Sequence, residues 1–455
     1  MSFFHKYDRT FQHFQSLDWN LSASEWQHRT DAALAWVRRS IAATGGRGSS
    51  HNWSPIFGWE KAYPETTGYL IETLRDYARL KNDPTLNDLA DNCADWLCTV
   101  QLPNGAFPAL LADSGQPSVF NTAMVLFGRP GCNGSTPPPT PPPKGRGATS
   151  ADAPMQGETR AMTPDAPMQG ETRAMTPDAP MQGETRAMTP DAPMQGEGSV
   201  MSPGTPMQRE TRAVTRLPFE GGAGGGVKRG VDYLLRSLSP DGSWRTDAYV
   251  PGFVPAYYTR AVWSVLKAGR SLQHPDTDEA MRHALHYYAG RFLPSGAIRD
   301  WGFWPGKAAF THTIAYTMEG FLESALLLGE AEILEKTIAS ANALLQQIEK
   351  NGRTAGRYDE AWGGDHSFYC LTGNAQLSVV FRRLWEVTGE VQFQQTAQFL
   401  LWEIIDFQNL GKNKNAFGTL PGSAPFWGKY VRLRYPNWAA KFFLDAMKGT
   451  MNDEI

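Results

Sequence analysis

The sequence predicts an all-α fold, an (α/α)6 toroid of six helical hairpins with a disordered low-complexity insertion. Six times along the 455 residues, a polar amphipathic segment runs into a glycine-bearing loop and then into a small-residue, nearly all-apolar segment. The apolar segments begin near Glu65, Asn121, Tyr257, His312, Thr372 and Tyr435, and successive starts are 56, 136, 55, 60 and 63 residues apart. Such repetition is typical of helical arrays, because a single hairpin cannot bury its own apolar face. Six hairpins favour a closed ring in which the starts of the inner helices surround one central pocket.

The first helix of each hairpin, the outer helix, shows a period of 3.6 residues with a polar face. We expect outer helices at residues 23–43, 84–101, 227–238, 275–292, 330–349 and 390–408. The inner helices are apolar almost all round, as burial between two layers requires. We expect them at residues 66–81, 121–128, 256–271, 313–329, 372–388 and 436–448.

The gap of 136 residues contains a segment of different composition. It holds a proline run and three copies of a 13-residue unit, which start at Asp152, Asp165 and Asp178. Because each unit contains proline and few large apolar side chains, it cannot form a packed core, and we expect disorder. The chain therefore divides into a first part of the toroid (1–128), an insertion (129–225) and the remainder of the toroid (226–455).

Composition excludes several classes of function. A formal net charge of −3 gives no basic field for nucleic acid, and no run of about 18 apolar residues predicts a membrane span. The first residues show no apolar run after a basic one, and the four cysteines form no CxxC pair. We therefore expect a cytoplasmic protein with reduced thiols.

Five short motifs at the inner-helix starts carry a family resemblance. They are YPETTGY at 63–69, AYYTR at 256–260, THTIAY at 311–316, LTGNAQ at 371–376 and YPNWAAK at 435–441. The chain resembles bacterial α/α-toroid proteins with prenyltransferase and squalene-oxidase-type repeats, which are associated with polysaccharide biosynthesis. It is also similar to the six-hairpin glycosidase superfamily. The resemblance implies the toroid and a role in carbohydrate metabolism, but similar toroids serve hydrolases, lyases, epimerases and terpenoid cyclases.

The candidate site residues are the polar and aromatic side chains at these helix starts and in the nearby loops. We expect Glu65, Tyr258 and His312 to be catalytic. We expect the substrate to be bound by Asn121, Tyr257, Arg260, Trp301, Tyr316, Tyr358, Asp359, Asn374, Gln376, Asn437 and Lys441. A structural reading competes for several of them, because a polar side chain at a helix start can satisfy free N–H groups or the helix dipole.

Two kinds of chemistry fit these residue types. Imidazole titrates near neutral pH, and His312 is one helical turn from Tyr316, so the two can move a proton while Asn or Arg neutralises a uronate. Glycoside hydrolysis needs instead two carboxyl groups about 5–9.5 Å apart. Glu65 with Asp359 or Glu360 is the candidate pair.

The sequence thus predicts a protein that acts on an oligo- or polysaccharide by acid–base chemistry, through glycoside hydrolysis or through uronate elimination or epimerisation. One alternative is a non-catalytic glycan-binding accessory protein of polysaccharide biosynthesis. A second alternative is a terpenoid cyclase-like enzyme, because residues 101–107 approximate the QxxxGxW repeat. The acid cluster at 276–279 argues against it, since it begins an outer helix. We expect no metal and no cofactor, because the nine histidines include no HxxxH pair.

Overall fold

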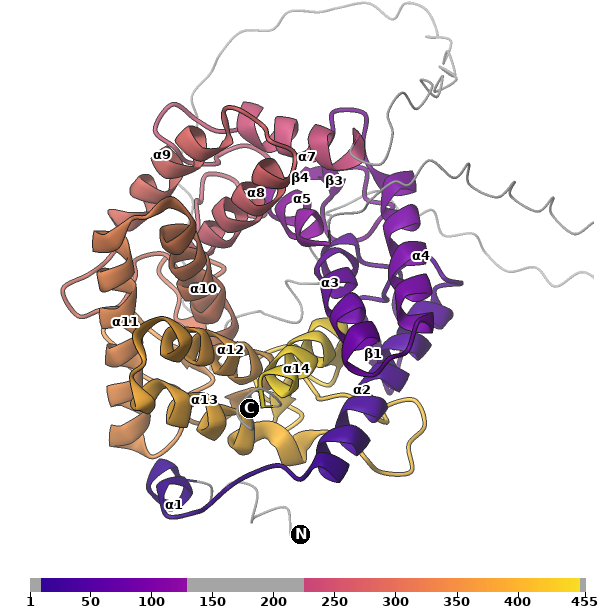
Figure 1. Cartoon of the computed structure of the whole chain (residues 1–455), viewed down its shortest axis with the longest axis vertical. Helices are drawn as coiled ribbons and strands as arrows, with labels where there is room; N and C mark the ends of the chain where they lie inside the picture. The colour runs from indigo at the N-terminus through magenta and orange to yellow at the C-terminus, as the bar shows by residue number, and fades with distance from the viewer. Residues whose placement is uncertain (1–9, 129–224, 451–455) are drawn as a thin grey trace, which may run out of the picture.

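The computed structural model describes residues 10–128 and 225–450, and its helices form two concentric rings (Figure 1), which confirms the (α/α)6 toroid. The outer helices are α2 (Ala23–Ala43), α4 (Thr85–Val100), α7 (Gly225–Arg236), α9 (Thr277–Ala289), α11 (Ala331–Asn351) and α13 (Val391–Ile404). The inner helices are α3 (Pro64–Leu80), α5 (Val119–Phe127), α8 (Thr259–Ser271), α10 (Thr311–Leu328), α12 (Leu371–Thr388) and α14 (Asn437–Thr450). A short helix, α1 (Phe11–Gln15), packs against α11 and α13. The described residues also include the 3-10 turns η2 (Ala256–Tyr258) and η3 (Ile405–Phe407).

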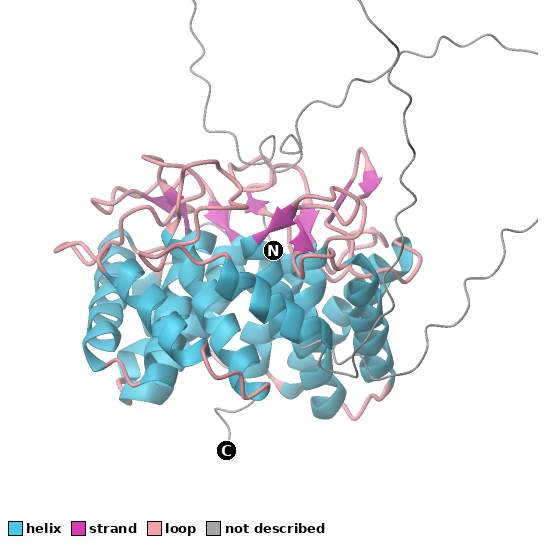
Figure 2. Ribbon diagram, turned by 90° about the horizontal axis from the view of Figure 1, so that it is seen from above, coloured by secondary structure: helices cyan, strands magenta, loops and turns pink. Residues whose placement is uncertain are grey.

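Short antiparallel strands and most of the long loops gather at one end of the rings, which we call the strand end (Figure 2). The pairs are β3 (Phe107–Pro108) with β4 (Pro117–Ser118), β5 (Ala309–Phe310) with β6 (Arg357–Tyr358), and β7 (Tyr369–Cys370) with β8 (Ser423–Ala424). A three-stranded sheet has the order β2 (Gly58–Trp59), β1 (Asn52–Ser54), β9 (Tyr435–Pro436). Strands β4, β5, β7 and β9 each run directly into an inner helix. The starts of the inner helices therefore lie at the strand end.

Glycines allow neighbouring inner helices to approach closely near these starts. A Cβ atom on Gly320 of α10 would lie 2.3 Å from the backbone carbonyl carbon of Thr259 on α8. One on Gly373 of α12 would lie 2.5 Å from the backbone nitrogen of His312 on α10. Any side chain would force these helices apart, so glycine keeps the inner ring narrow at the level of the candidate site.

The first and last hairpins meet, which closes the ring. Strand β1 pairs with β9, so that Trp53 lies opposite Tyr435. The indole N–H of Trp26 donates to the carbonyl of Met447 at 2.8 Å. Helix α14 thus contacts both α2 and α3, although the sequence separates them by more than 350 residues.

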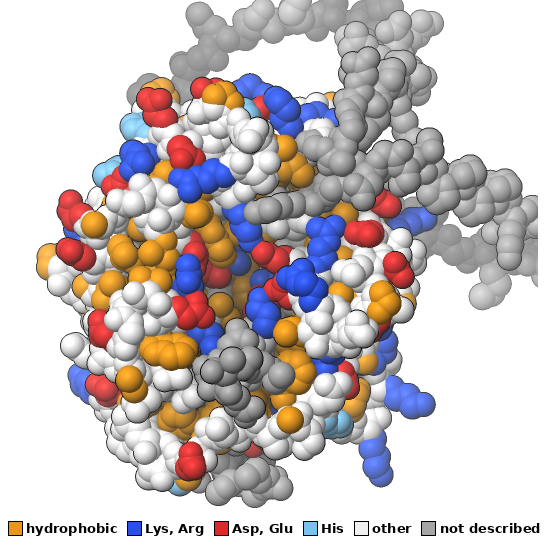
Figure 3. Space-filling view, in the orientation of Figure 1, with side chains coloured by type: hydrophobic (Ala, Val, Ile, Leu, Met, Phe, Trp, Pro, Cys, Tyr) orange, Lys and Arg blue, Asp and Glu red, His pale blue; other side chains and the backbone are white. Residues whose placement is uncertain are grey.

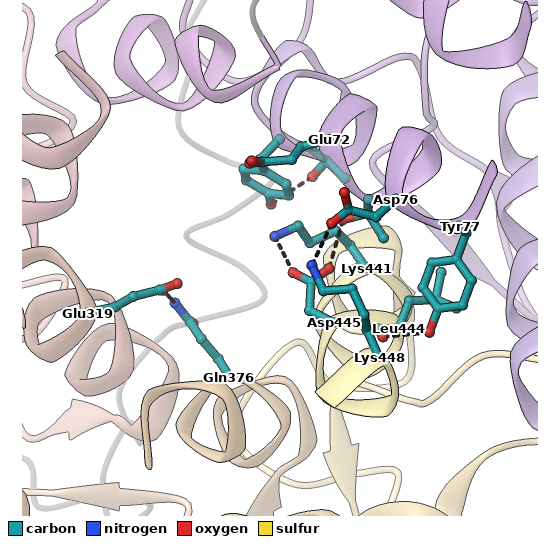
Figure 4. Close-up of polar contacts among 12 residues, drawn as sticks. Glu72, Asp76, Tyr77, Glu319, Gln376, Lys441, Leu444, Asp445 and Lys448 are labelled. Atoms are coloured by element: carbon teal, nitrogen blue, oxygen red, sulfur yellow. Dashed lines mark hydrogen bonds and ion pairs between the residues drawn. The ribbon is translucent and has the colours of Figure 1, made fainter. Parts of the chain in front are cut away.

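Charged side chains reinforce this closure inside the ring (Figure 4). Asp445 accepts a hydrogen bond from Thr73 at 2.8 Å and pairs with Lys441 at 2.5 Å. Lys448 pairs with Asp76, also at 2.5 Å. On the face opposite the strands, acidic and basic side chains surround the central hollow (Figure 3). This end of the ring is therefore a network of mutually neutralised charges.

The inner helix before the insertion is short, as the sequence predicts. Helix α5 has 9 residues, whereas α10 and α12 have 18 each. Helix α7, which resumes the ring after the gap, packs against α5. The predicted disorder of the insertion concerns residues outside the described part of the chain. The three-part division of the chain likewise stays a prediction.

No helix in residues 10–128 and 225–450 is both long and apolar enough to cross a membrane. Among the described cysteines, Cys93 and Cys370 are free and buried. Cys98 is disulfide-bonded, so the expectation of four reduced thiols is wrong at this residue. Because disulfides are typical of oxidising compartments, the thiols no longer support a cytoplasmic location.

Candidate active site

A narrow cavity lies where the inner helices begin. Its walls are Tyr63, Glu65, Phe120, Tyr249, Phe303, His312, Tyr316, Tyr430 and Trp438. They come from the starts of α3, α5, α10 and α14 and from three loops. The cavity has a volume of about 20 Å³, room for about one ordered water molecule. The ring thus brings together three of the predicted residues, Glu65, His312 and Tyr316.

Glu65 is buried in the first turn of α3, directly after Pro64, whose fixed φ suits the first helical position. The hydroxyl of Tyr63 donates a hydrogen bond to Glu65 Oε2. The hydroxyl of Tyr249 lies 3.4 Å from the same oxygen, and that of Tyr316 lies 3.5 Å from Oε1. Tyrosines from three different segments therefore surround one carboxyl group. Glu65 is the only carboxylic acid among the described cavity walls.

His312 is buried at the start of α10, with its ring centroid 4.2 Å from that of Tyr316. Burial lowers the pKa of His312 to about 3, and the positive charge of Arg260 contributes to the same effect. The imidazole is therefore neutral over the range in which most proteins are stable. A neutral imidazole has one donor nitrogen and one acceptor nitrogen.

Hydrogen bonds below His312 determine which nitrogen carries the proton. Gln376 donates its amide N–H to Glu319 Oε2 at 2.8 Å (Figure 4), and its Oε1 lies 3.1 Å from His312 Nδ1. Because a carboxylate only accepts hydrogen bonds, the amide nitrogen of Gln376 must face Glu319 and its oxygen must face the imidazole. His312 Nδ1 is thus the donor, which leaves the lone pair on Nε2.

Arg260 lies beneath the cavity and is not one of its walls. It is buried on α8, where it forms an ion pair with Glu319. Its guanidinium lies 4.7 Å from the ring centre of Tyr316 and 5.0 Å from that of Phe127, both within cation–π range. The site therefore rests on a fixed positive charge whose counter-ion also orients Gln376.

Three predicted residues support the cavity wall from behind or from its edge. Asn121 donates to the carbonyl of Pro108 at 2.7 Å and accepts from the Tyr249 hydroxyl. Tyr257 packs edge-on against Phe120, with ring centroids 5.0 Å apart. Tyr258, predicted to be catalytic, is fully buried and stacks on Phe120 at 5.8 Å. Burial raises the pKa of Tyr258, so it stays protonated in the core.

Four predicted residues from a loop and from β6 with its following turn lie together at another part of the strand end. Trp301 and Tyr358 both pack against Trp362, at 5.2 and 5.7 Å between ring centroids. Asp359 accepts backbone N–H groups within its own turn at 2.7 and 2.9 Å. Glu360 accepts the backbone N–H of Asp300, from a different loop, at 2.8 Å. The described cavity walls therefore include neither carboxyl group of the candidate hydrolytic pairs with Glu65.

The remaining predicted residues have structural partners. Asn374 donates to Glu403 at 2.6 Å, toward the outer helix α13. Asn437 accepts the indole N–H of Trp36 at 2.8 Å. Lys441 pairs with Asp445 inside the ring. These contacts hold helices together. They are not bonds to the free N–H groups of a helix start, which the structural reading expected.

Several important residues had weak signals in the sequence. Tyr249 and Phe303 lie in irregular loops, where no periodic pattern indicates which way a side chain points. Glu319 did have a signal, because it is an acid in the middle of a mostly apolar inner helix, and a buried charge requires a partner.

The fold is similar to that of several solved structures, although no family model and no curated protein sequence matches the chain. An unsaturated glucuronyl hydrolase specific for heparin has a TM-score of 0.58 at 11% identity, over 94% of this chain and 97% of that one. Cellobiose 2-epimerase from Bacillus thermoamylovorans has a TM-score of 0.56 at 10% identity, over 93% and 98%. An alpha-amylase from Clostridium perfringens has a TM-score of 0.54 at 9% identity, over 93% and 97%. At these identities the likeness concerns the fold, so the chain has the six-hairpin glycosidase-type architecture.

Proposed function

We propose that this protein performs acid–base chemistry on a carbohydrate, with Glu65 and His312 as the groups that transfer protons. The observation that carries the proposal is that a buried carboxyl group and a neutral imidazole, from two separate inner helices, are walls of one cavity. Tyr316 contacts both of them. The similar folds belong to proteins named as a glucuronyl hydrolase and a sugar epimerase, which supports a carbohydrate as the substrate class.

The walls favour epimerisation or elimination over hydrolysis. Hydrolysis by the usual route needs two carboxyl groups, and the described cavity walls offer one. Removal of a proton beside a sugar carboxylate needs a base, an acid and stabilisation of the negative charge that develops. In this proposal His312 Nε2 accepts the proton from carbon, and Glu65 in its protonated form delivers a proton. The proton goes to the opposite face of that carbon in epimerisation, or to the leaving oxygen in elimination. The hydroxyls of Tyr63 and Tyr316 donate hydrogen bonds to the carboxyl group of Glu65.

An acidic sugar suits this site better than a neutral one. Arg260 beneath the cavity is paired with Glu319, yet its positive charge is one cause of the low pKa of His312, so the charge acts on groups inside the cavity. A bound uronate would offset that charge and raise the pKa of the imidazole, because a nearby anion stabilises the protonated form. The substrate itself would thus make His312 a stronger base.

Sugar entry requires Tyr249 to move. The cavity holds about one water molecule, and the Tyr249 hydroxyl is hydrogen-bonded to Asn121 beside Glu65. Tyr249 thus occupies a place that suits a substrate hydroxyl. It belongs to the loop between Trp244 and η2, which has backbone in the left-handed region at Asp247 and Gly252.

The wider setting is also part of the proposal. We assign the protein to polysaccharide biosynthesis, with oligo- or polysaccharides as its substrates. The terpenoid alternative loses support because its acid cluster lies on α9, where Asp278 pairs with Arg270 at 2.7 Å away from the cavity.

The test is incubation of the purified protein with uronic-acid and neutral polysaccharides in deuterated water. Ultraviolet absorbance of an unsaturated product indicates elimination, and deuterium on a ring carbon without chain cleavage indicates epimerisation. New reducing ends with neither signal would contradict the proton-transfer proposal and indicate hydrolysis. Binding without any product would leave only the glycan-binding accessory role. The Glu65→Gln variant is the control for contaminating activity.

A further inference from the structure

Four large apolar side chains are exposed at the tips of two loops at the strand end. Ile56 and Phe57, 70% and 73% exposed, form the turn of the β1–β2 hairpin. Trp427 and Leu433, 59% and 42% exposed, belong to the loop between β8 and β9. We call these four side chains the apolar rim. The other large exposed apolar side chains among the described residues are Leu17, Leu80 and Val391.

Packed aromatic rings, of which Trp53 is buried and Tyr435 half-buried, connect the two loops of the apolar rim. Tyr435 packs against Trp53 of the hairpin at 5.5 Å and against Phe426 of the second loop at 5.1 Å between ring centroids. The backbone N–H of Leu433 donates to the carbonyl of Phe426 at 3.0 Å. The β1–β9 pairing fixes the same two segments side by side. Ring packing and strand pairing therefore hold the two loops of the apolar rim together.

The loop that carries Trp427 and Leu433 also forms a wall of the cavity. Tyr430, between them in sequence, lines the cavity and accepts a hydrogen bond at 2.7 Å from Trp438, another wall. Val431 and Leu433 have φ values of 45° and 56°, a left-handed conformation that costs energy for such side chains. The loop keeps this costly conformation while Tyr430 points inward and Leu433 points outward. One loop thus contributes side chains both to the cavity wall and to the apolar rim.

The charges beside the apolar rim favour a polar partner over a lipid surface. Arg434 pairs with Glu60 at 3.5 Å, and Lys429 pairs with Asp365 at 3.0 Å. Both signs alternate here, whereas surfaces that bind anionic membranes are polybasic. Exposed apolar patches bordered by polar groups mark ligand grooves as well as protein interfaces. A sugar chain uses both parts, because its C–H faces pack on rings and its hydroxyls bond to charged groups.

We propose that the apolar rim binds the part of an oligosaccharide that extends out of the cavity, with Trp427 and Phe57 stacked against sugar rings. This inference rests on the function proposed above for its substrate class, and it does not require catalysis by Glu65 or His312. It assigns the rim a role in selecting chain length. The cavity alone holds a disaccharide, whereas a longer chain also contacts the apolar rim.

Calorimetric titration with a uronic-acid disaccharide and a hexasaccharide of the same repeat tests this proposal. Wild-type protein should bind the hexasaccharide at least about tenfold more tightly. Trp427→Ala should remove that advantage and leave the disaccharide affinity unchanged, and Phe57→Ala should reduce the advantage. The matched control is Val391→Ala, which removes an exposed apolar side chain at the start of α13, on the end opposite the strands. It should change neither affinity.

The outcomes separate this proposal from the catalytic one. If the hexasaccharide binds through the apolar rim but is not converted, the result supports the rim proposal and contradicts the catalytic proposal. If the wild type binds the disaccharide and the hexasaccharide with equal affinity, the rim proposal is wrong and the catalytic proposal is unaffected. Failure of both saccharides to bind overturns the rim, as does Trp427-dependent binding to phosphatidylcholine vesicles or Trp427-dependent dimerisation.

Discussion

The side chain of Gln376 on α12 accepts a hydrogen bond from His312 on α10, with 3.1 Å between Oε1 and Nδ1. The same amide donates to Glu319, which is the counter-ion of Arg260. One buried ion pair therefore sets the orientation of an amide, and the amide sets the tautomer of the imidazole. This chain of contacts explains how a buried histidine presents its lone pair at Nε2.

Replacement of Gln376 tests this relay directly. In wild-type protein, His312 should exist as one tautomer with the proton on Nδ1, and Gln376→Leu should give a mixture because Nδ1 loses its acceptor. Nitrogen-15 NMR of the ring nitrogens measures the tautomer without any substrate. Gln346→Leu, on the exposed face of α11, is the control and should leave the spectrum unchanged. A proton on Nε2 in the wild type would contradict the relay.

The ion pair below the site should be important for stability. Glu319→Gln leaves the Arg260 cation buried without its counter-ion, so the free energy of unfolding should fall by about 3–5 kcal/mol. Glu332→Gln breaks an exposed pair with Lys336 on α11 and should cost far less, because water screens exposed ion pairs. Urea unfolding of both variants gives the comparison. Equal losses would mean that the buried pair contributes no more than a surface pair.

Acid should destabilise the protein through His312. The pKa of this group is about 3 in the folded protein and 6.5 in the unfolded chain. Between these values the unfolded state binds the proton and the folded state does not, so stability falls as the pH falls from about 6.5 to about 3. The slope approaches about 1.4 kcal/mol per pH unit. Urea unfolding over this pH range should show that the free energy of unfolding falls with pH in the wild type and falls less steeply in His312→Gln. Parallel curves for the two proteins would contradict the role of His312.

Removal of the Tyr249 ring should open the cavity. Tyr249→Ala removes a wall and the hydrogen bond to Asn121, so the closed state no longer competes with substrate. We expect uronic-acid disaccharide affinity to rise about tenfold, which corresponds to about 1.4 kcal/mol of closing free energy. Tyr249→Phe keeps the ring and loses only the hydroxyl, so its effect should be intermediate. Weaker binding by both variants would instead make Tyr249 part of the sugar site.

The repeated architecture could be predicted from the sequence because its signals are local. The outer helix at 23–43 was located to the residue, and the starts of the inner helices fell within three residues of those observed. Periodicity and small-residue composition determine these features, and they do not depend on the rest of the ring.

The residues of the site were only partly predictable, because a side chain must point into the cavity as well as lie at a helix start. Glu65, His312 and Tyr316 point into the cavity, whereas Asn374 at a similar helix start points outward to Glu403. A rotation of about 100° per residue separates these outcomes, and a boundary error of one or two residues hides it. The Tyr249 loop was not predictable, since nothing local in its sequence specifies its contact with Asn121.

The central claim is that Glu65 and His312 transfer protons on a bound carbohydrate. The most direct measurement is the turnover rate of Glu65→Gln and of His312→Gln on the saccharide that the wild type converts, with melting temperature measured in parallel. Each variant should lose at least about 100-fold in turnover while its melting temperature above pH 7 changes little. Turnover within a few-fold of wild type in either folded variant would contradict the account.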